Sequence, residues 1–376
     1  MNERMVREIE EILGPGFRMD YFSRLKGYAV FHADRLLVDE EDMRRLVTLL
    51  MSRGYYPQID SRDGYWILHV VPYKQKQGMS PVWVHVLLFL LTILTTMMAG
   101  ATLLGKDYFS DFSQILHGWK YSFAVLCILS AHEFGHYLAA RYHRIRATLP
   151  YYIPLPIPGF HFGTLGAFIK IKSPIPHRKA LLDVGAAGPL AGFVVSLIFL
   201  IIGYWRLPDF QGIVAYVETI HPWNMHGEGI NLVLGKSLLF AFFNDFIAGG
   251  RLPMNEVYHF PFIFAGWVGL LVTAINLIPI GQLDGGHILY ALIGKHARYM
   301  GILAFIFLLL LNLVLIVRFL SFVWVVWIFL ILFLIGFRHP STVQDDIPLN
   351  ATRRKVGWFT LFIFFLCFTP LPVYIA

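Results

Sequence analysis

Long apolar segments separated by short polar ones fill the chain from residue 82 to its end. Seven of them approach the length that crosses a bilayer as a helix, about 20 residues. They lie near residues 82–104, 119–141, 180–204, 261–293, 298–317, 320–337 and 356–375. The pattern predicts an α-helical polytopic membrane protein with about six to seven transmembrane helices, the last of which is interrupted by prolines.

Residues 1–78 have shorter apolar patterns of two kinds. An apolar stripe from Met43 to Leu50 has the spacing of one helix face. Asp63-Gly64, a pair typical of hairpin turns, lies between two runs rich in aromatic and β-branched residues. We therefore expect a small N-terminal α+β domain over residues 1–78, followed by a transmembrane domain over residues 79–376.

The composition agrees with a membrane protein. Hydrophobic residues make up 57% of the chain and charged residues 15%, whereas an ordinary soluble domain is about 45–50% apolar and about 25% charged. Cys127 and Cys367 both lie in apolar runs, so no disulfide framework is expected. The net charge of +7 needs no nucleic acid partner, because its distribution along the chain fits a lipid bilayer.

The loops predict an orientation. Residues 141–179 hold seven Lys or Arg and no acid, whereas residues 206–260 hold three basic residues and five acids. By the positive-inside rule, residues 1–78 and 141–179 lie in the cytoplasm. We expect a multi-pass protein of the cytoplasmic membrane of a prokaryote, with its N-terminal domain cytoplasmic.

The second apolar segment carries the sequence His132-Glu133-Phe134-Gly135-His136. Residues four apart lie on one helix face, so His132 and His136 can bind one cation while Glu133 reaches another ligand of that cation. This pair suits zinc, whose third protein ligand must come from elsewhere. Charged groups at membrane depth are costly, which favours a metal site over isolated structural histidines.

A second polar group interrupts the fourth apolar segment. Pro279 and Gly281 break the helix there, which is tolerated at membrane depth only where the backbone is buried in protein or lines a cavity. Asp284 lies in this break and is the favoured third ligand because a carboxylate offsets the charge of the cation; His287 is its competitor. Asn276 either holds a substrate backbone or caps the broken helix.

The connection after the second segment has unusual features. Prolines exclude a helix near residue 150, and Gly163-Thr-Leu-Gly166 leads into residues 167–172, which have strand character. The expected fold therefore includes a membrane-associated β-hairpin or strand here. The segment is either a connection along the surface or an edge strand that pairs with an extended substrate.

The third segment begins with Gly185, Gly188 and Gly192, to which we assign close helix packing and no chemistry.

The two polar motifs together resemble the site-2 protease family of intramembrane zinc metalloproteases. HEFGH lies in a membrane segment and is followed by Asn276-x-x-Pro279-x-x-x-Leu283-Asp284-Gly285. The resemblance covers roughly residues 82–294, and residues 1–78 and the last segments lie outside it.

This resemblance implies one Zn²⁺ per chain, bound by His132, His136 and Asp284, with Glu133 as the catalytic base. It implies that substrate contacts Asn276 and the strand near Gly163–Ile171, which includes Gly166, Phe168 and Ile169. The implied activity is regulated cleavage of single-span membrane proteins, within their transmembrane segments and near the cytoplasmic face.

Two functions other than a protease need different features. A di-iron oxygenase needs several histidine clusters, whereas His287, His296 and His339 are scattered. A non-catalytic membrane scaffold or transporter that retains a metal site is the alternative, and the intact Glu133 argues against it. The sequence gives neither the oligomeric state nor the identity of the substrate.

Overall fold

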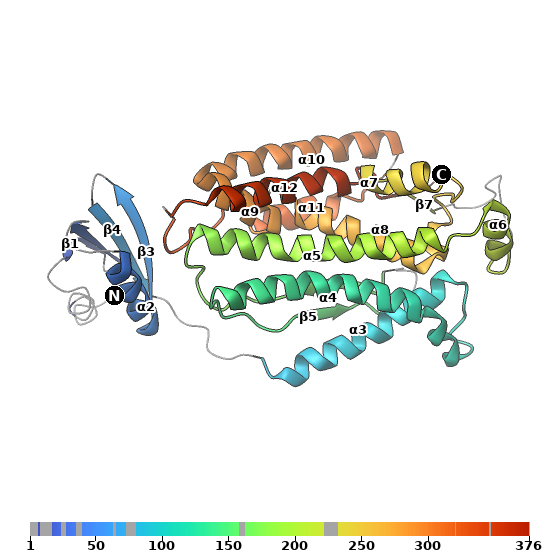
Figure 1. Ribbon diagram of the computed structural model, residues 1–376, viewed down its shortest axis with the longest axis horizontal. Coiled ribbons are helices and arrows are strands. Elements are labelled where there is room, and N and C mark those ends of the chain that lie inside the picture. Colours follow the sequence, from blue (N-terminus) through green and yellow to red (C-terminus); the bar gives the residue numbers. More distant parts are fainter. Residues whose placement is uncertain are drawn as a thin grey trace.

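The computed structural model shows a body of long helices with a small sheet at one end (Figure 1). It describes residues 7, 17–23, 28–34, 40–62, 65–72, 80–157, 162–221, 232–319, 321–345 and 347–375.

Four helical stretches among these residues are long and apolar enough to cross a membrane, so the chain is a membrane protein by helix length and composition. They are α3 (Val82–Leu103), α4 (Trp119–Tyr142) with the preceding η1 (Phe112–Gly118), α5 (Arg178–Trp205), and α9 (Asp284–Ile293) continued through η4 (Gly294–His296) into α10 (Ala297–Phe319).

The other predicted spans are shorter or divided, so the count of seven is not confirmed. The fourth segment is two helices, α8 (Pro261–Asn276) and α9, because Pro279 lacks an N–H and Gly281 has a positive φ of 54°. The sixth segment forms only α11 (Val325–Leu330) and η5 (Ile331–Ile335). In the seventh, α12 (Ala351–Cys367) ends before the prolines.

Helix α5 lies in the middle of the body and packs against α4, α8 and α9 (Figure 1). Glycines allow these close approaches: a Cβ added to Gly135 of α4 would lie 2.5 Å from the carbonyl oxygen of Ala187 in α5. The largest fully buried side chains in this core include Trp267 and Tyr121. The central position of α5 lets it contact the polar residues of both predicted motifs.

Shorter elements lie at the end of the body away from the N-terminal sheet. β7 (Leu232–Leu234) pairs antiparallel with β8 (Val373–Ile375), so the C-terminal strand lies there too (Figure 1). The remaining elements of this region are α6 (Phe210–Glu218), α7 (Leu238–Ala241), η2 (Phe242–Ile247) and η3 (Val257–His259).

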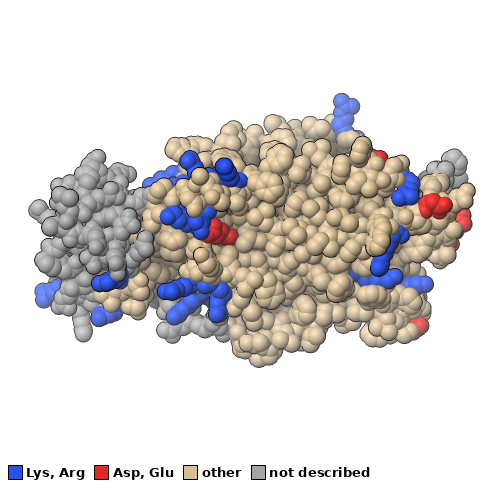
Figure 2. Space-filling view, viewed as in Figure 1, with Lys and Arg blue, Asp and Glu red and all other residues tan. Residues whose placement is uncertain are grey.

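Charged residues mark the two ends of the body. Figure 2 shows a broad middle with few charges and basic residues gathered near the N-terminal sheet. The residues at that end include Arg141 near the end of α4, Arg178 at the start of α5 and Arg353 at the start of α12. An uncharged belt between charged ends is the surface that a bilayer requires.

A two-stranded sheet lies beside α3 and α4. β5 (Tyr151–Pro154) pairs antiparallel with β6 (Thr164–Phe168), and an isolated bridge joins Ala147 to Ile171. The strand predicted at 167–172 therefore begins earlier, at Thr164. After Phe168 the regular pairing stops, and only the isolated bridge at Ile171 continues it. Among the described residues the opposite edge of β6 pairs with no strand.

The N-terminal residues form a four-stranded antiparallel sheet in the order β1-β2-β4-β3. Its members are β1 (Phe17–Ser23), β2 (Tyr28–Asp34), β3 (Tyr55–Arg62) and β4 (Tyr65–Pro72), joined by α2 (Glu40–Ser52). The predicted helix and hairpin strands are present, and β1 and β2 are additional. Arg62 pairs with Tyr65, and Asp63-Gly64 lies outside the described residues.

The segment 341–344 joins this sheet to the helical body. Ile59 of β3 donates its N–H to the carbonyl oxygen of Val343 at 2.8 Å, and the Tyr56 hydroxyl donates to Ser341 at 3.0 Å. On its other side, Gln344 donates to the carbonyl oxygen of Pro176 at 2.9 Å. The outer edge of β3 is therefore covered, as an edge strand needs.

Candidate metal centre

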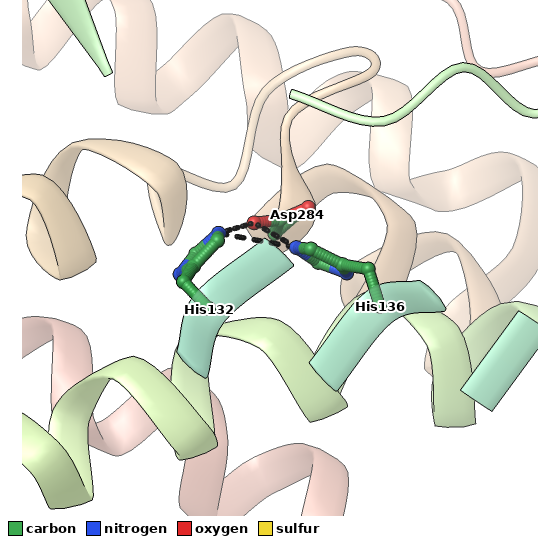
Figure 3. A group of neighbouring side chains, drawn as sticks. All are labelled: His132, His136 and Asp284. Atoms are coloured by element: carbon green, nitrogen blue, oxygen red, sulfur yellow. Dashed lines mark hydrogen bonds and ion pairs between the residues drawn. The ribbon is translucent and has the colours of Figure 1, made fainter. Parts of the chain in front are cut away.

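His132, His136 and Asp284 meet inside the helical body, between α4 and the first residue of α9 (Figure 3). The two histidine Nε2 atoms are 3.1 Å apart, and Asp284 Oδ2 lies 3.3 Å from His132 Nε2 and 3.2 Å from His136 Nε2. Both imidazoles are buried, with exposures of 4% and 7%. Three donors from segments about 150 residues apart thus point to one place.

This donor set fits a zinc ion. Ligand atoms about 2.0–2.1 Å from a tetrahedral zinc ion stand about 3.3 Å from one another. The three distances here match that value, and two imidazoles with one carboxylate are the donors of many catalytic zinc sites. A zinc ion held by these three residues would have one position left for water or substrate.

The backbone of α5 orients one of the two imidazoles. His136 Nδ1 donates to the carbonyl oxygen of Val184 at 2.7 Å, which leaves Nε2 as the atom facing Asp284.

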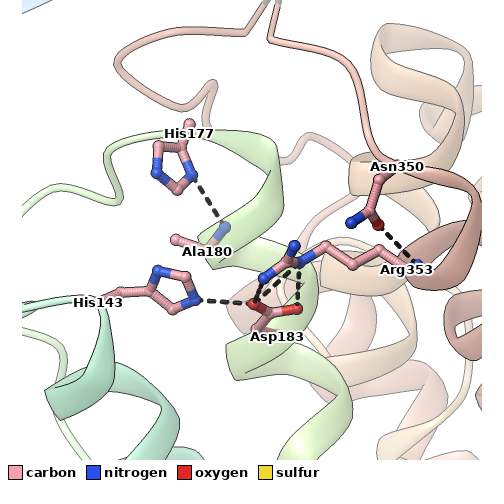
Figure 4. A network of polar contacts seen from close by, with 6 residues as sticks. All are labelled: His143, His177, Ala180, Asp183, Asn350 and Arg353. Carbon is pink, nitrogen blue, oxygen red and sulfur yellow. Dashed lines mark hydrogen bonds and ion pairs between the residues drawn. The ribbon is translucent and has the colours of Figure 1, made fainter.

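A charged network surrounds Asp183, the residue before Val184 (Figure 4). Arg353 of α12 donates from Nε and Nη2 to the Asp183 carboxylate at 2.9 and 2.8 Å, and His143 Nε2 lies 2.8 Å from Asp183 Oδ2. His177 caps the start of α5 by accepting from Ala180 N at 3.0 Å. Together these contacts fix the first turns of α5, and the sequence analysis did not identify them.

Two glycines of α5 face the imidazoles directly. A Cβ added to Gly188 would lie 2.1 Å from His136 Nε2, and one added to Gly192 would lie 3.2 Å from His132 Nδ1. The prediction that these small residues serve packing alone is therefore incomplete, because they also make room for the candidate ligands. The spacing of three and four residues that places Gly185, Gly188 and Gly192 on one face was the available signal.

The turn between α8 and α9 places Asp284. Gly285 and Gly286 pack so tightly that an added Cβ would lie 2.1 Å from the carbonyl oxygen of Leu277 and 2.4 Å from that of Gly281, respectively. Asn276, the last residue of α8, has its Nδ2 3.2 Å from His132 Nε2. Asn276 thus lies beside the candidate ligands.

His287, the competing third ligand, points elsewhere. Its Nδ1 lies 2.5 Å from His339 Nε2, and the His339 ring stacks on Tyr290 at 4.5 Å between centroids. The segment that contains His339 continues into residues 341–344, which contact β3. His287 therefore links α9 to this segment and is not grouped with His132 and His136.

Glu133 is buried on α4, with 6% exposure, and its carboxylate faces the backbone N–H of Ile169 just after β6. The neighbouring Lys170 donates its N–H in the opposite direction, to Thr148 Oγ1 at 3.0 Å. The outer edge of this segment thus faces α4 at the position of Glu133.

The other residues predicted to contact substrate lie at different places along β6. Gly163 packs against α3, because an added Cβ would lie 2.6 Å from the carbonyl oxygen of Thr95. Gly166 has open space around it and a positive φ of 98°. Phe168 stacks on Tyr151 of β5 at 5.3 Å between centroids. Gly163 therefore allows the residue before β6 to pack closely against α3. Gly166 has no close neighbour, so the strand is accessible at that position.

Residues 120–314 match peptidase family M50, the family of site-2 proteases. The chain belongs to this family. The matched range contains His132, Glu133, His136 and Asp284. The resemblance inferred from the two motifs is confirmed.

Curated plant proteins are similar to this member of family M50. A protein named "Probable zinc metalloprotease EGY2, chloroplastic" from Oryza sativa subsp. indica is 33% identical over 245 residues, which cover 63% of the chain and 42% of the rice protein. The protein of the same name from Arabidopsis thaliana is 31% identical over 210 residues, 55% of the chain and 35% of the relative. The chain thus spans less than half the length of these relatives. No solved structure matches the chain significantly.

Two expectations from the sequence, the cofactor and the kind of membrane, can be compared with these relatives. Zinc as the cofactor agrees with the family and with the names of the relatives. The expectation of a prokaryotic cytoplasmic membrane finds no support, because the relatives are named as chloroplast proteins.

Proposed function

We propose that this member of family M50 is an intramembrane zinc endopeptidase that cleaves the transmembrane segments of single-span membrane proteins. The observation that carries the proposal is the convergence of His132, His136 and Asp284 beside a buried carboxylate on the same helix. By the positive-inside rule the basic end of the body lies on the cytoplasmic side, and His132 and His136 lie in the half of α4 nearer that end, so cleavage would take place near that face.

Each residue has a role that follows from its position. A zinc ion held by His132, His136 and Asp284 supplies a Lewis acid and a water whose pKa falls to about 7. Glu133 follows His132 directly, so its buried carboxylate would accept the proton of the attacking water and pass it to the leaving amine. The buried Glu133 carboxylate beside the candidate ligands favours a hydrolase over a non-catalytic scaffold.

The edge near Ile169 gives the substrate a place to bind in an extended form. The carbonyl groups of a helical substrate are engaged in hydrogen bonds, so the segment must unwind before attack, and each unsatisfied backbone group in hydrocarbon costs several kcal/mol. Pairing with the outer edge of β6 and the residues that follow it replaces those bonds. The Asn276 amide lies close enough to the ligands to donate to a substrate carbonyl.

The test is cleavage of a single-span substrate by the purified full chain in lipid vesicles. Candidate substrates carry a label on each side of one transmembrane segment, and the wild type is compared with Glu133→Gln. We expect the variant to lose cleavage by at least about 100-fold while it keeps its zinc. Glu218→Gln, which changes an exposed acid of α6, is the matched control and should cleave normally. Equal cleavage by wild type and Glu133→Gln would overturn the proposal.

A further inference from the structure

A second group of metal-binding side chains lies at the opposite end of the body. His221 follows α6, Glu256 precedes η3, and His259 ends η3. The Nε2 atoms of the two histidines are 3.0 Å apart, and Glu256 Oε2 lies 3.4 Å from His221 Nε2 and 3.5 Å from His259 Nε2. Three possible ligand atoms therefore converge on one point.

This group has the same donors as the first centre, two imidazole nitrogens and one carboxylate oxygen. Its three distances also bracket the separation of about 3.3 Å between the ligands of a tetrahedral zinc ion. Imidazole donors favour zinc and similar transition metals over calcium or magnesium, which prefer oxygen ligands.

A hydrogen bond on the Nδ1 side of the ring fixes the orientation of His259. Its Nδ1 donates to the carbonyl oxygen of Leu103, the last residue of α3, at 2.5 Å. This bond leaves the lone pair on Nε2, the atom that faces His221 and Glu256.

Glu256 supplies an independent observation. The residue is buried, with 4% exposure, and its Oε2 has no hydrogen-bond partner among the described residues. Buried carboxylate oxygens are nearly always paired, because an unpaired one loses its hydration without compensation. A cation bound between Oε2 and the two imidazoles removes this penalty.

We propose that His221, Glu256 and His259 bind a second divalent cation of the zinc type, separate from the first centre. His221 is 37% exposed, which gives the ion a path from solvent. A cavity of about 300 Å³, lined in part by Arg206 and Lys120, adjoins His259. The ion fastens the ends of α3 and α6 to the start of α8, and its role is structural.

The experiment counts zinc in the full chain purified in detergent and dialysed against buffered zinc. We expect two zinc ions in the wild type, one in the variant His132→Ala/His136→Ala and one in Glu256→Gln. His117→Ala, which removes an exposed histidine at the same end, should keep both ions. One ion in the wild type, or two in Glu256→Gln, would overturn the proposal.

Cobalt spectroscopy provides a second measurement that does not depend on the folding of one variant. In the His132→Ala/His136→Ala background, added Co²⁺ should give the visible absorption of a tetrahedral site, and zinc should raise the melting temperature. Introducing His221→Asn into that background should abolish both effects, because it removes a ligand that is partly exposed. Cobalt absorption that persists after this change, or that never develops, contradicts a second site.

Discussion

His136 donates from Nδ1 to the carbonyl oxygen of Val184 at 2.7 Å, so a backbone group of α5 sets the direction of a candidate ligand on α4. The preceding residue, Asp183, accepts hydrogen bonds from both Nε and Nη2 of Arg353 in α12. The position of the imidazole therefore depends on three helices that are distant in sequence.

Arg353 should influence zinc binding although it is no ligand. Because Arg353→Gln removes the charged hydrogen bonds to Asp183, we expect zinc affinity to fall by about 10-fold, the lower end of the effects seen for groups behind metal ligands. Competition with a chelator of known affinity measures the change. Arg354→Gln, the exposed neighbour, is the control and should bind like the wild type. Equal affinities for the two variants would show that the network does not position His136.

Gly188 should tolerate no side chain. In Gly188→Ala the new methyl group would lie 2.1 Å from His136 Nε2, so either the imidazole or α5 must move. We expect zinc loss or at least about 10-fold weaker zinc binding, measured as zinc per chain after gel filtration. The comparison is Gly301→Ala in α10, whose nearest neighbour would be 3.3 Å away. If Gly188→Ala binds zinc as tightly as Gly301→Ala, the contact between the two helices is looser than described.

Asp284 and His287 should differ in their effect on zinc. Asp284→Asn removes the negative charge next to both imidazoles, and we expect zinc affinity to fall by about 100-fold or more. His287→Gln removes a ring that pairs with His339, so it should retain zinc. The two variants are compared in one chelator titration, with circular dichroism as a check on folding. Zinc loss in His287→Gln with retention in Asp284→Asn would reverse the assignment of the third ligand.

The backbone N–H of Ile169 should matter more than its side chain. Ile169→Pro removes the N–H that faces Glu133, and we expect a fall in cleavage of about 10-fold or more with unchanged zinc content. Ile169→Ala keeps the N–H and should retain most of the activity. The measurement is the initial rate of cleavage in vesicles. Equal rates for the proline and alanine variants would show that the edge of this strand does not bind the substrate.

Much of the metal centre could be predicted from local spacing. His132 and His136 share a face in any α-helix, and Pro279 and Gly281 interrupt a helix in any fold, so the two polar motifs and the helical class follow from the sequence. The apolar pattern also predicted the segments of α3, α4, α5 and α10. It overestimated the fourth, sixth and seventh spans, because apolar composition alone does not reveal where a helix divides or ends.

The choice between Asp284 and His287 required the tertiary structure, since these residues lie one helical turn apart and only the direction of α9 decides which one faces α4. The same holds for Gly188, whose role depends on the contact between α5 and His136.

His221 and His259 are 38 residues apart and form no motif, so the spacing of Glu256 and His259 was the one local signal. The sequence by itself determines which side chains share one face of a helix and where a helix is interrupted. Which distant side chains meet depends on how the helices pack.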